Sequence, residues 1–312
     1  MPSIADIDNT LQRFWIIEDV NYSPKTNPDD AYVEMHFQQT HSRTVDGKYV
    51  IELPFKSENP IFSNTLCGAL SRFNAVERRL SKDVGLKEKY TKFMREYLQL
   101  GHMIECDAKE ITTTTGRVFY LPHHPVLGEK IRIVFDGSFR DEMGISLNNT
   151  LHIGPCIQRN LIAVCLRFRL HPYVFSADII KMFRQIWVAA KHQNYQRILW
   201  RENPTEELKH YKLRTVTYGT SCAPFIAVRV LEQIATDYKT QFPRASKIIM
   251  EDFYVDDVIT GAESEDELLK IKAELVQLLS LGGLQLSKWV SNSHLLHPTD
   301  DTQINFISEC KS

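Results

Sequence analysis

The sequence predicts an α+β fold, in which helices back an antiparallel sheet and acidic residues lie at its exposed edge. Short apolar runs rich in β-branched and aromatic residues are typical of strands, and they lie at residues 111–138, 173–180, 196–201 and 211–217. Between them, apolar residues recur at helical spacing at residues 64–80, 87–100, 155–169 and 224–238 and from residue 264 onward. The alternation of the two patterns favours a sheet with helices packed on it.

The first half of the chain begins with a predicted N-terminal extension, residues 1–60, which contains an apolar docking point at residues 14–17 and a strand at residues 49–53. The helix that follows buries one face, because its apolar residues recur every three or four positions: Leu66, Leu70, Phe73, Val76 and Leu80. The next helix is expected to end at Gly101.

The segment at residues 111–138 alternates in the manner of paired strands, with turns at residues 116–117 and 128–130. His123 and His124 are neighbours in it and resemble a metal-binding pair. Adjacent residues of a strand point to opposite faces, so the two rings do not easily chelate one ion. This pattern favours a structural role for the two histidines.

The second half of the chain carries the acidic residues. A short apolar run interrupted by Asp178 is typical of a buried strand, and a buried carboxylate without a partner is costly. The runs at residues 248–250 and 258–259 predict two strands joined by a tight turn with Asp256 and Asp257 at its tip. The alternative is an ordinary hairpin turn, in which Asp is common.

The third carboxylate favours a metal site over a polar turn. Adjacent carboxylates repel one another unless a cation lies between them. If Asp178 ends a strand beside the hairpin, three carboxylates converge on a site for Mg²⁺. Two such ions about 3.5 to 4 Å apart stabilise the attacking and leaving oxygens of a phosphoryl displacement. The acids therefore predict nucleotidyl transfer or phosphodiester hydrolysis.

Two predicted helices flank these acids. The first begins near Pro224, which suits the first turn of a helix. Its buried stripe is Phe225, Val228, Leu231, Ile234 and Tyr238. The second helix begins after Ser264, which forms a capping-box pattern with Glu267. These residues are assigned to the core and to helix capping.

Composition is that of an ordinary globular protein: 312 residues, 43% hydrophobic and 24% charged, enough for one large domain or two modest ones. No apolar stretch is long enough to span a membrane, and no secretory leader is recognisable at the N-terminus. The six cysteines show no metal-binding spacing, which favours reduced thiols in a cytosolic protein.

Charge is unevenly distributed although the net charge is only −2. Residues 1–60 contain 5 Lys and Arg against 10 Asp and Glu, and residues 251–312 contain 4 against 12. Residues 159–214 contain 11 against 4. A basic surface of this kind attracts the phosphate backbone of nucleic acids, and the alternative is a solvated basic face.

Three segments resemble successive polymerase motifs of a reverse transcriptase: Ala-Asp-Ile-Ile-Lys-Met-Phe at 177–183, Tyr-Gly-Thr-Ser-Cys-Ala-Pro-Phe at 218–225 and Tyr-Val-Asp-Asp at 254–257. Four more are similar to the BEL/Pao group of long-terminal-repeat retrotransposons, at residues 121–126, 132–138, 181–186 and 288–292. The resemblance runs from about Leu11 to about Asn292. It implies a right-hand polymerase with fingers and palm, in which helices back an antiparallel palm sheet and the thumb is absent.

The resemblance also implies domain boundaries. After the N-terminal extension, residues 61–172 form a fingers-rich region with leading helices, and residues 173–292 form the palm with the catalytic motifs. Residues 293–312 form a tail that no longer resembles the family. The chain thus looks like a piece of a longer polyprotein.

Site residues follow from the same resemblance. Asp178, Asp256 and Asp257 match the catalytic triad and would hold two Mg²⁺ ions, for which Mn²⁺ is a substitute. Phe183 matches the aromatic ring beneath the incoming sugar, where it would clash with a ribose 2′-hydroxyl. The alternative for Phe183 is a core phenylalanine.

The remaining matches concern the nucleotide. Lys130 and Arg132 match the fingers residues that grip the triphosphate, or are an exposed pair of cations at a strand edge. Tyr218 and Gly219 match the turn beneath the nascent base pair, where glycine lets the backbone approach the substrate closely. Lys288 matches a lysine that helps to protonate the leaving pyrophosphate, or is a solvated lysine.

The function implied is that of an RNA-directed DNA polymerase core, in which a primer 3′-hydroxyl attacks the α-phosphate of a dNTP. Its partners would be an RNA or DNA template with primer and dNTPs, without a membrane, in a cytoplasmic retroelement particle or, alternatively, the nucleus. The other hypothesis is a truncated, catalytically silent remnant that folds and retains at most nucleic-acid binding. A metal-dependent nuclease gives no reason for Arg132, Phe183 and the Gly219 turn to occur in this order.

Overall fold

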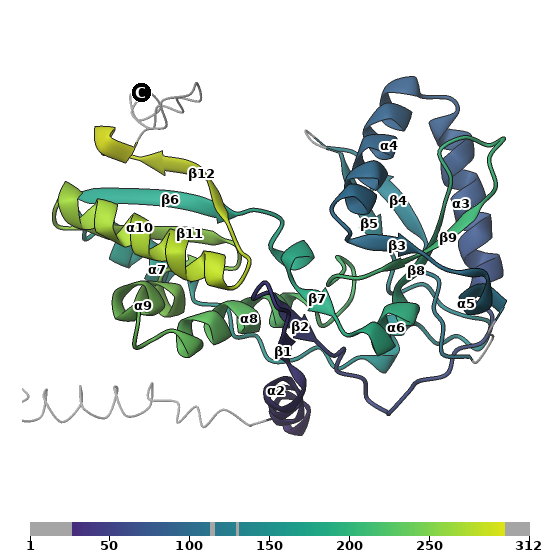
Figure 1. The fold of residues 1–312 in the computed structure, drawn as a ribbon, viewed down its shortest axis with the longest axis horizontal. Coiled ribbons are helices and arrows are strands. Elements are labelled where there is room, and N and C mark those ends of the chain that lie inside the picture. Colours follow the sequence, from purple (N-terminus) through teal and green to yellow (C-terminus); the bar gives the residue numbers. More distant parts are fainter. Residues whose placement is uncertain (1–26, 113–115, 129–130, 297–312) are drawn as a thin grey trace, which may run out of the picture.

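The computed structural model describes residues 27–112, 116–128 and 131–296, which form two lobes side by side along the long axis (Figure 1). The predicted docking point at residues 14–17 lies outside the described residues. We call the lobe with the four-stranded sheet the carboxylate lobe and the other the distal lobe.

The carboxylate lobe contains an antiparallel sheet in the order β10-β11-β6-β12. Its strands are β6 (Tyr173–Ile179), β10 (Phe253–Tyr254), β11 (Asp257–Ala262) and β12 (Leu286–Ser291). Its helices are α7 (Leu161–Phe168), α8 (Ala223–Asp237), α9 (Pro243–Glu251) and α10 (Glu265–Leu281), followed after β12 by the short η3 (His294–Leu296). Helices α7 and α10 pack on β11, and α8 and α9 pack on each other. The predicted antiparallel sheet backed by helices is therefore present.

The distal lobe combines helices with two small antiparallel sheets. Its helices are α3 (Leu66–Leu80), α4 (Val84–Gln99), α5 (Ala108–Thr112) and α6 (Leu147–Thr150). One sheet has the order β3-β9-β8, with β3 (Met103–Glu105), β8 (Arg197–Trp200) and β9 (Lys209–Leu213). The other is the pair β4 (His123–Val126) and β5 (Arg132–Phe135).

Local signals explain several of these elements. The Asp83 side chain accepts a hydrogen bond from the Leu86 amide at 2.9 Å and caps α4, and Gly101 follows α4 with a left-handed φ of +68°. His123 is buried and His124 is exposed, as the strand alternation predicted. The His123 ring donates from Nε2 to the Leu199 carbonyl at 2.8 Å, which confirms its structural role.

The N-terminal extension connects the two lobes. It consists of α2 (Pro28–Thr40), β1 (Ser42–Arg43) and β2 (Tyr49–Ile51), and β2 pairs in parallel with β7 (Trp187–Val188). On either side of β7 lie the short helices η1 (Met182–Gln185) and η2 (Ala190–Gln196). Residues 28–51 of the predicted extension are thus built into the fold.

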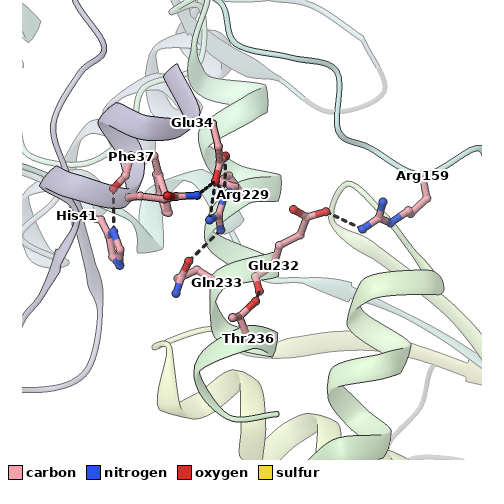
Figure 2. Close-up of polar contacts among 9 residues, drawn as sticks. Glu34, Phe37, His41, Arg159, Arg229, Glu232, Gln233 and Thr236 are labelled. Atoms are coloured by element: carbon pink, nitrogen blue, oxygen red, sulfur yellow. Dashed lines mark hydrogen bonds and ion pairs between the residues drawn. The ribbon is translucent and has the colours of Figure 1, made fainter. Parts of the chain in front are cut away.

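Figure 2 shows how α2 is held on α8. The Arg229 guanidinium donates to both carboxylate oxygens of Glu34 at 2.9 Å and lies 4.6 Å from the ring centroid of Phe37. A second pair in the same view, Arg159 to Glu232 at 2.7 Å, holds the segment before α7 on α8. A planar guanidinium suits such bidentate and stacked contacts.

Some predicted elements differ from the structure. Residues 248–250, predicted as a strand, lie in α9, which begins at Pro243 and buries Ala245, Ile248 and Ile249 on one face. The helix predicted at 155–169 is confined to α7, capped by Asn160, whose side chain accepts from the Ile162 amide at 2.9 Å. Residues 111–112 end α5 and are not in a strand. The strand predicted at 211–217 begins earlier, at Lys209, and ends at Leu213.

In the described part of the chain, no helix combines the length and the apolar character needed to cross a membrane.

Candidate functional site

Three carboxylates meet at one end of the four-stranded sheet. Asp178, on β6, lies opposite Asp257, the first residue of β11, and the Ile179 amide donates to the Asp256 carbonyl at 2.8 Å. The carboxyl group of Asp178 is within hydrogen-bond contact of that of Asp256. The structure thus brings Asp178 next to Asp256 and Asp257, which follow it by more than seventy positions in the sequence.

A strained turn presents Asp256. Tyr254 pairs with Asp257, so the turn between β10 and β11 has only two residues, Val255 and Asp256. Such turns need a left-handed residue, and Val255 has a φ of +58°. A β-branched side chain is disfavoured in this region, and strain of this kind concentrates at functional sites.

The pKa values of Asp256 and Asp257 are both raised. Burial raises the pKa of Asp256, and the charges of Asp178 and Asp257 raise it further. Burial and the charge of Asp178 also raise the pKa of Asp257, while Lys288 lowers it. The cluster therefore has too little positive charge around it, as expected of a cation-binding site.

Lys288 supplies the one ammonium group that contacts these acids in the described part of the chain. It lies on β12, and its Nζ forms an ion pair with Asp178 Oδ2. The pairing of β12 with β6 shifts register between Ser287 and Val290, and Lys288 in this bulge has a φ of +53°. The hydrogen bond to Asp178 raises the pKa of Lys288. Strand β12 therefore brings Lys288 to the acids.

The donor set fits a hard divalent cation by its chemistry. Within the described residues, no three His, Cys, Asp or Glu side chains already surround a single metal position. Three neighbouring carboxylates, one of them bound by an ammonium group, are the oxygen ligands that Mg²⁺ prefers. The Lys288 ammonium occupies an oxygen of Asp178 that such an ion would use.

Two aromatic rings lie next to the acids. Phe183 is in η1, four residues beyond the end of β6, and its ring centroid is 4.7 Å from that of Tyr218, with 46° between the planes. Burial raises the pKa of Tyr218, and the nearby charges of Asp256 and Asp178 add to this effect. Phe183 is half-buried and packs against the core, while Tyr218 is 37% exposed.

Arg132 reaches the same region from the distal lobe. It is exposed at the start of β5 and lies close enough to Tyr218 to lower that residue's pKa. Its guanidinium forms no hydrogen bond or ion pair with another residue that the structure describes. The other predicted triphosphate ligand, Lys130, lies outside the described residues.

Gly219 has a structural reason to be glycine. Its φ is +98°, and a Cβ there would overlap the carbonyl oxygen of Phe135 on β5. Gly219 therefore lies close to the backbone of the distal lobe. Asn148 fixes this contact, because its amide donates to the Gly219 carbonyl at 2.9 Å and its Oδ1 accepts from the Ser221 amide at 2.9 Å. No sequence motif had assigned a role to Asn148.

Arg184 is a second residue that the motifs did not single out. Its side chain is 4% exposed, and it donates to Glu96 of α4 at 2.8 Å and to His102 Nδ1 at 3.0 Å. Its guanidinium lies 4.0 Å from the ring centroid of Tyr97. Arg184 thus ties the segment after Asp178 to the distal lobe.

Much of the positive charge of the basic segment at residues 159–214 is paired with carboxylates, several of these pairs at exposed side chains. Eight of its eleven cations form ion pairs with carboxylates: Arg159, Arg167, Lys181, Arg184, Lys191, Arg201, Lys209 and Lys212. Most of the partners lie outside the segment, so a count along the chain does not reveal them. The segment is not a continuous free surface for phosphate.

Residues 146–289 match the family model described as Reverse transcriptase (RNA-dependent DNA polymerase). The match contains the three carboxylates, both aromatic rings, Gly219 and Lys288, and it excludes Arg132. It supports a reverse-transcriptase-like polymerase function. Among curated proteins, no sequence matches the chain. The reverse transcriptase domain so defined spans the whole four-stranded sheet apart from the last two residues of β12, and it also takes in β8 and β9 of the distal lobe.

Proposed function

We propose that the chain is the RNA-directed DNA polymerase core of a BEL/Pao-type long-terminal-repeat retrotransposon. It would transfer a nucleotide from a dNTP to a primer 3′-hydroxyl on an RNA or DNA template. The observation that carries the proposal is the meeting of Asp178, Asp256 and Asp257 at one sheet end within the reverse transcriptase match.

Asp178 and Asp256 would be the main ligands of two Mg²⁺ ions, for which Mn²⁺ is a substitute, and Asp257 would lie beside them. Such ions polarise the phosphoryl group and stabilise the attacking and leaving oxygens. The carboxylates lie on adjacent strands and a two-residue turn, so the sheet hydrogen bonds fix their positions. This pre-organisation is what a phosphoryl transfer site needs.

Phe183 would discriminate deoxyribose from ribose. Its ring is held by Tyr218 at 4.7 Å and by the core, so it cannot easily retreat from an added 2′-hydroxyl. The core packing and the sugar contact are compatible, because the ring is only half-buried. A rigid steric wall of this kind rejects the wrong substrate without new attractive contacts.

Arg132 and Lys288 would engage the triphosphate. Arg132 is exposed near Tyr218 with its guanidinium uncommitted among the described residues, and a guanidinium binds phosphate oxygens in pairs. Lys288 lies on β12 in contact with Asp178, where its ammonium would protonate the leaving pyrophosphate. Lys130 belongs to this proposal by resemblance alone.

The BEL/Pao assignment rests on the sequence segments at 121–126, 132–138, 181–186 and 288–292. Two of their residues stabilise the fold. His123 is buried between α4 and β8, and Arg184 in η1 donates a hydrogen bond to Glu96 in α4. Residues 121–138 lie outside the reverse transcriptase match.

Primer extension tests the function. The purified chain is given a homopolymer RNA template, a DNA primer and the complementary dNTP with Mg²⁺ or Mn²⁺, beside Asp256→Asn and the control Asp266→Asn. Asp266 is an exposed acid in the first turn of α10, so its variant removes one charge away from the site. We expect wild type and Asp266→Asn to extend the primer and Asp256→Asn to fail. If wild type extends no more than Asp256→Asn, the catalytically silent alternative holds for this chain.

A further inference from the structure

Strand β12 places an ammonium group on the carboxylate that a metal ion would need. The strand lies at the edge of the sheet, paired only with β6, and its bulge turns Lys288 toward Asp178. The Asp178 side chain is 18% exposed, while that of Lys288 is 70% exposed. The acid is therefore fixed, and the lysine reaches it from solvent.

A lysine and a divalent cation cannot share this carboxylate oxygen at full strength. The ammonium contacts Asp178 Oδ2 and is attracted by Asp256 and Asp257 as well. A tethered group acts at a high effective concentration, so it competes with a free ion without being consumed. Because the lysine side chain is mostly exposed, its ion pair is weak, and breaking it costs little free energy.

We propose that Lys288 is a tethered competitor of the divalent cation: its ammonium holds Asp178 while no metal is bound, and metal binding displaces it. The proposal rests on the proposed function, because it takes Asp178 as a metal ligand. It adds a regulation of that site: without a bound metal, the Lys288 ammonium offsets part of the negative charge of the cluster, and weaker metal binding is the consequence. The displaced ammonium remains on β12 beside the site, where it can meet an anionic triphosphate.

Direct measurement of Mn²⁺ binding to the full chain tests the competition without turnover. Isothermal titration calorimetry is done without nucleic acid or nucleotide on wild type, Lys288→Gln, Lys288→Arg and Lys272→Gln. Lys272 is the matched control, because it lies on α10 with its Nζ 4.7 Å from the ring centroid of Trp289, the residue after Lys288. Within the described residues, it forms no ion pair with the three acids. Circular dichroism confirms that each variant is folded.

We expect Lys288→Gln to bind Mn²⁺ about tenfold more tightly than wild type, a change of about 1.4 kcal/mol. Lys288→Arg keeps the charge and is expected to bind no more tightly than wild type. Lys272→Gln removes the same charge from the same region and is expected to stay within about twofold of wild type, because screened surface charges act weakly at a distance. Equal tightening by both glutamine variants would show a general charge effect and would overturn the proposal.

The variants Asp178→Asn and Asp256→Asn separate this proposal from the proposed function. If both bind Mn²⁺ as tightly as wild type, the ion binds elsewhere and the metal site of the proposed function fails. If both lose Mn²⁺ binding while Lys288→Gln binds no more tightly than wild type, the site stands and only the competition by Lys288 is wrong.

Discussion

Replacing Glu96 by glutamine is expected to destabilise the protein, because it removes the carboxylate that neutralises a buried guanidinium. Glu96 accepts from Arg184 at 2.8 Å and from Lys181 at 2.7 Å, so one acid on α4 serves two cations that follow Asp178. Two groups would remain around Arg184 in the variant: the ring of Tyr97 at 4.0 Å and the Nδ1 atom of His102 at 3.0 Å.

The burial of the two partners sets the size of the effect. Breaking a fully buried ion pair costs about 3–5 kcal/mol, and breaking an exposed one costs about 0–1 kcal/mol. The side chain of Arg184 is 4% exposed and that of Glu96 is 35% exposed, which places this pair between the two limits. Glutamine keeps one neutral acceptor oxygen. We therefore expect a loss of about 2 kcal/mol in the free energy of unfolding.

Thermal denaturation followed by circular dichroism measures this loss. At about 2 °C per kcal/mol for large domains, Tm should fall by roughly 4 °C. The matched control is Glu202→Gln, since Glu202 pairs with Arg95 at 2.6 Å near the same helix, but the Arg95 side chain is 60% exposed. The free energy of unfolding of Glu202→Gln should fall by less than about 1 kcal/mol. If the two variants lose the same stability, the buried guanidinium does not depend on Glu96 and the reasoning is wrong.

Four further predictions concern other parts of the fold and site. Phe183→Ala is expected to lower the preference for dNTP over rNTP in primer extension, and an unchanged preference would remove its role at the sugar. Gly219→Ala should destabilise the protein much more than Gly144→Ala in urea denaturation. Both glycines have a left-handed φ, which costs an alanine about 1–2 kcal/mol, but only at Gly219 would the added Cβ overlap a backbone oxygen. Arg229→Ala should cost about 2 kcal/mol in thermal denaturation by leaving the half-buried acid of α2 unpaired, and no loss would contradict the anchoring of α2. Burial lowers the pKa of His123 from 6.5 to about 4, so stability is fully present above pH 6.5 and is lost as pH falls toward 4; the Tm of His123→Gln should depend less on pH over this range than that of wild type.

Strand β6 and the three acids could be predicted because their signals are local. An apolar run with one carboxylate is typical of a buried strand, and residues 173–179 form β6 with Asp178 near its end. The run at residues 248–250 was misleading, because β-branched residues also suit the buried face of a helix once Pro243 starts one. The choice between the two structures was decided by packing on α8 and β10, which no local pattern contains.

The contacts that hold the site could not be predicted, since their partners are far apart in the chain. Arg184 and Glu96 are separated by 88 positions, and Asn148 and Gly219 by 71. Counting charges along residues 159–214 gave a basic segment, but the acids that neutralise it come mostly from elsewhere. The position of Lys288 depended on a bulge in β12, which changes the register that strand periodicity would assign.

Those long-range contacts also bear on how much of the chain the site needs. Glu96 and Phe135 lie before residue 146, outside the reverse transcriptase match, yet one neutralises the arginine after Phe183 and the other packs on the Gly219 turn. Glu34 of α2, whose carboxylate pairs with Arg229 of α8, also lies outside the match. The matched residues therefore contain the acids but only part of what positions the two rings beside them. Both lobes position Phe183 and the Gly219 turn beside the acids, so changes at Glu96 should alter the proposed nucleotide site although Glu96 is not itself part of it.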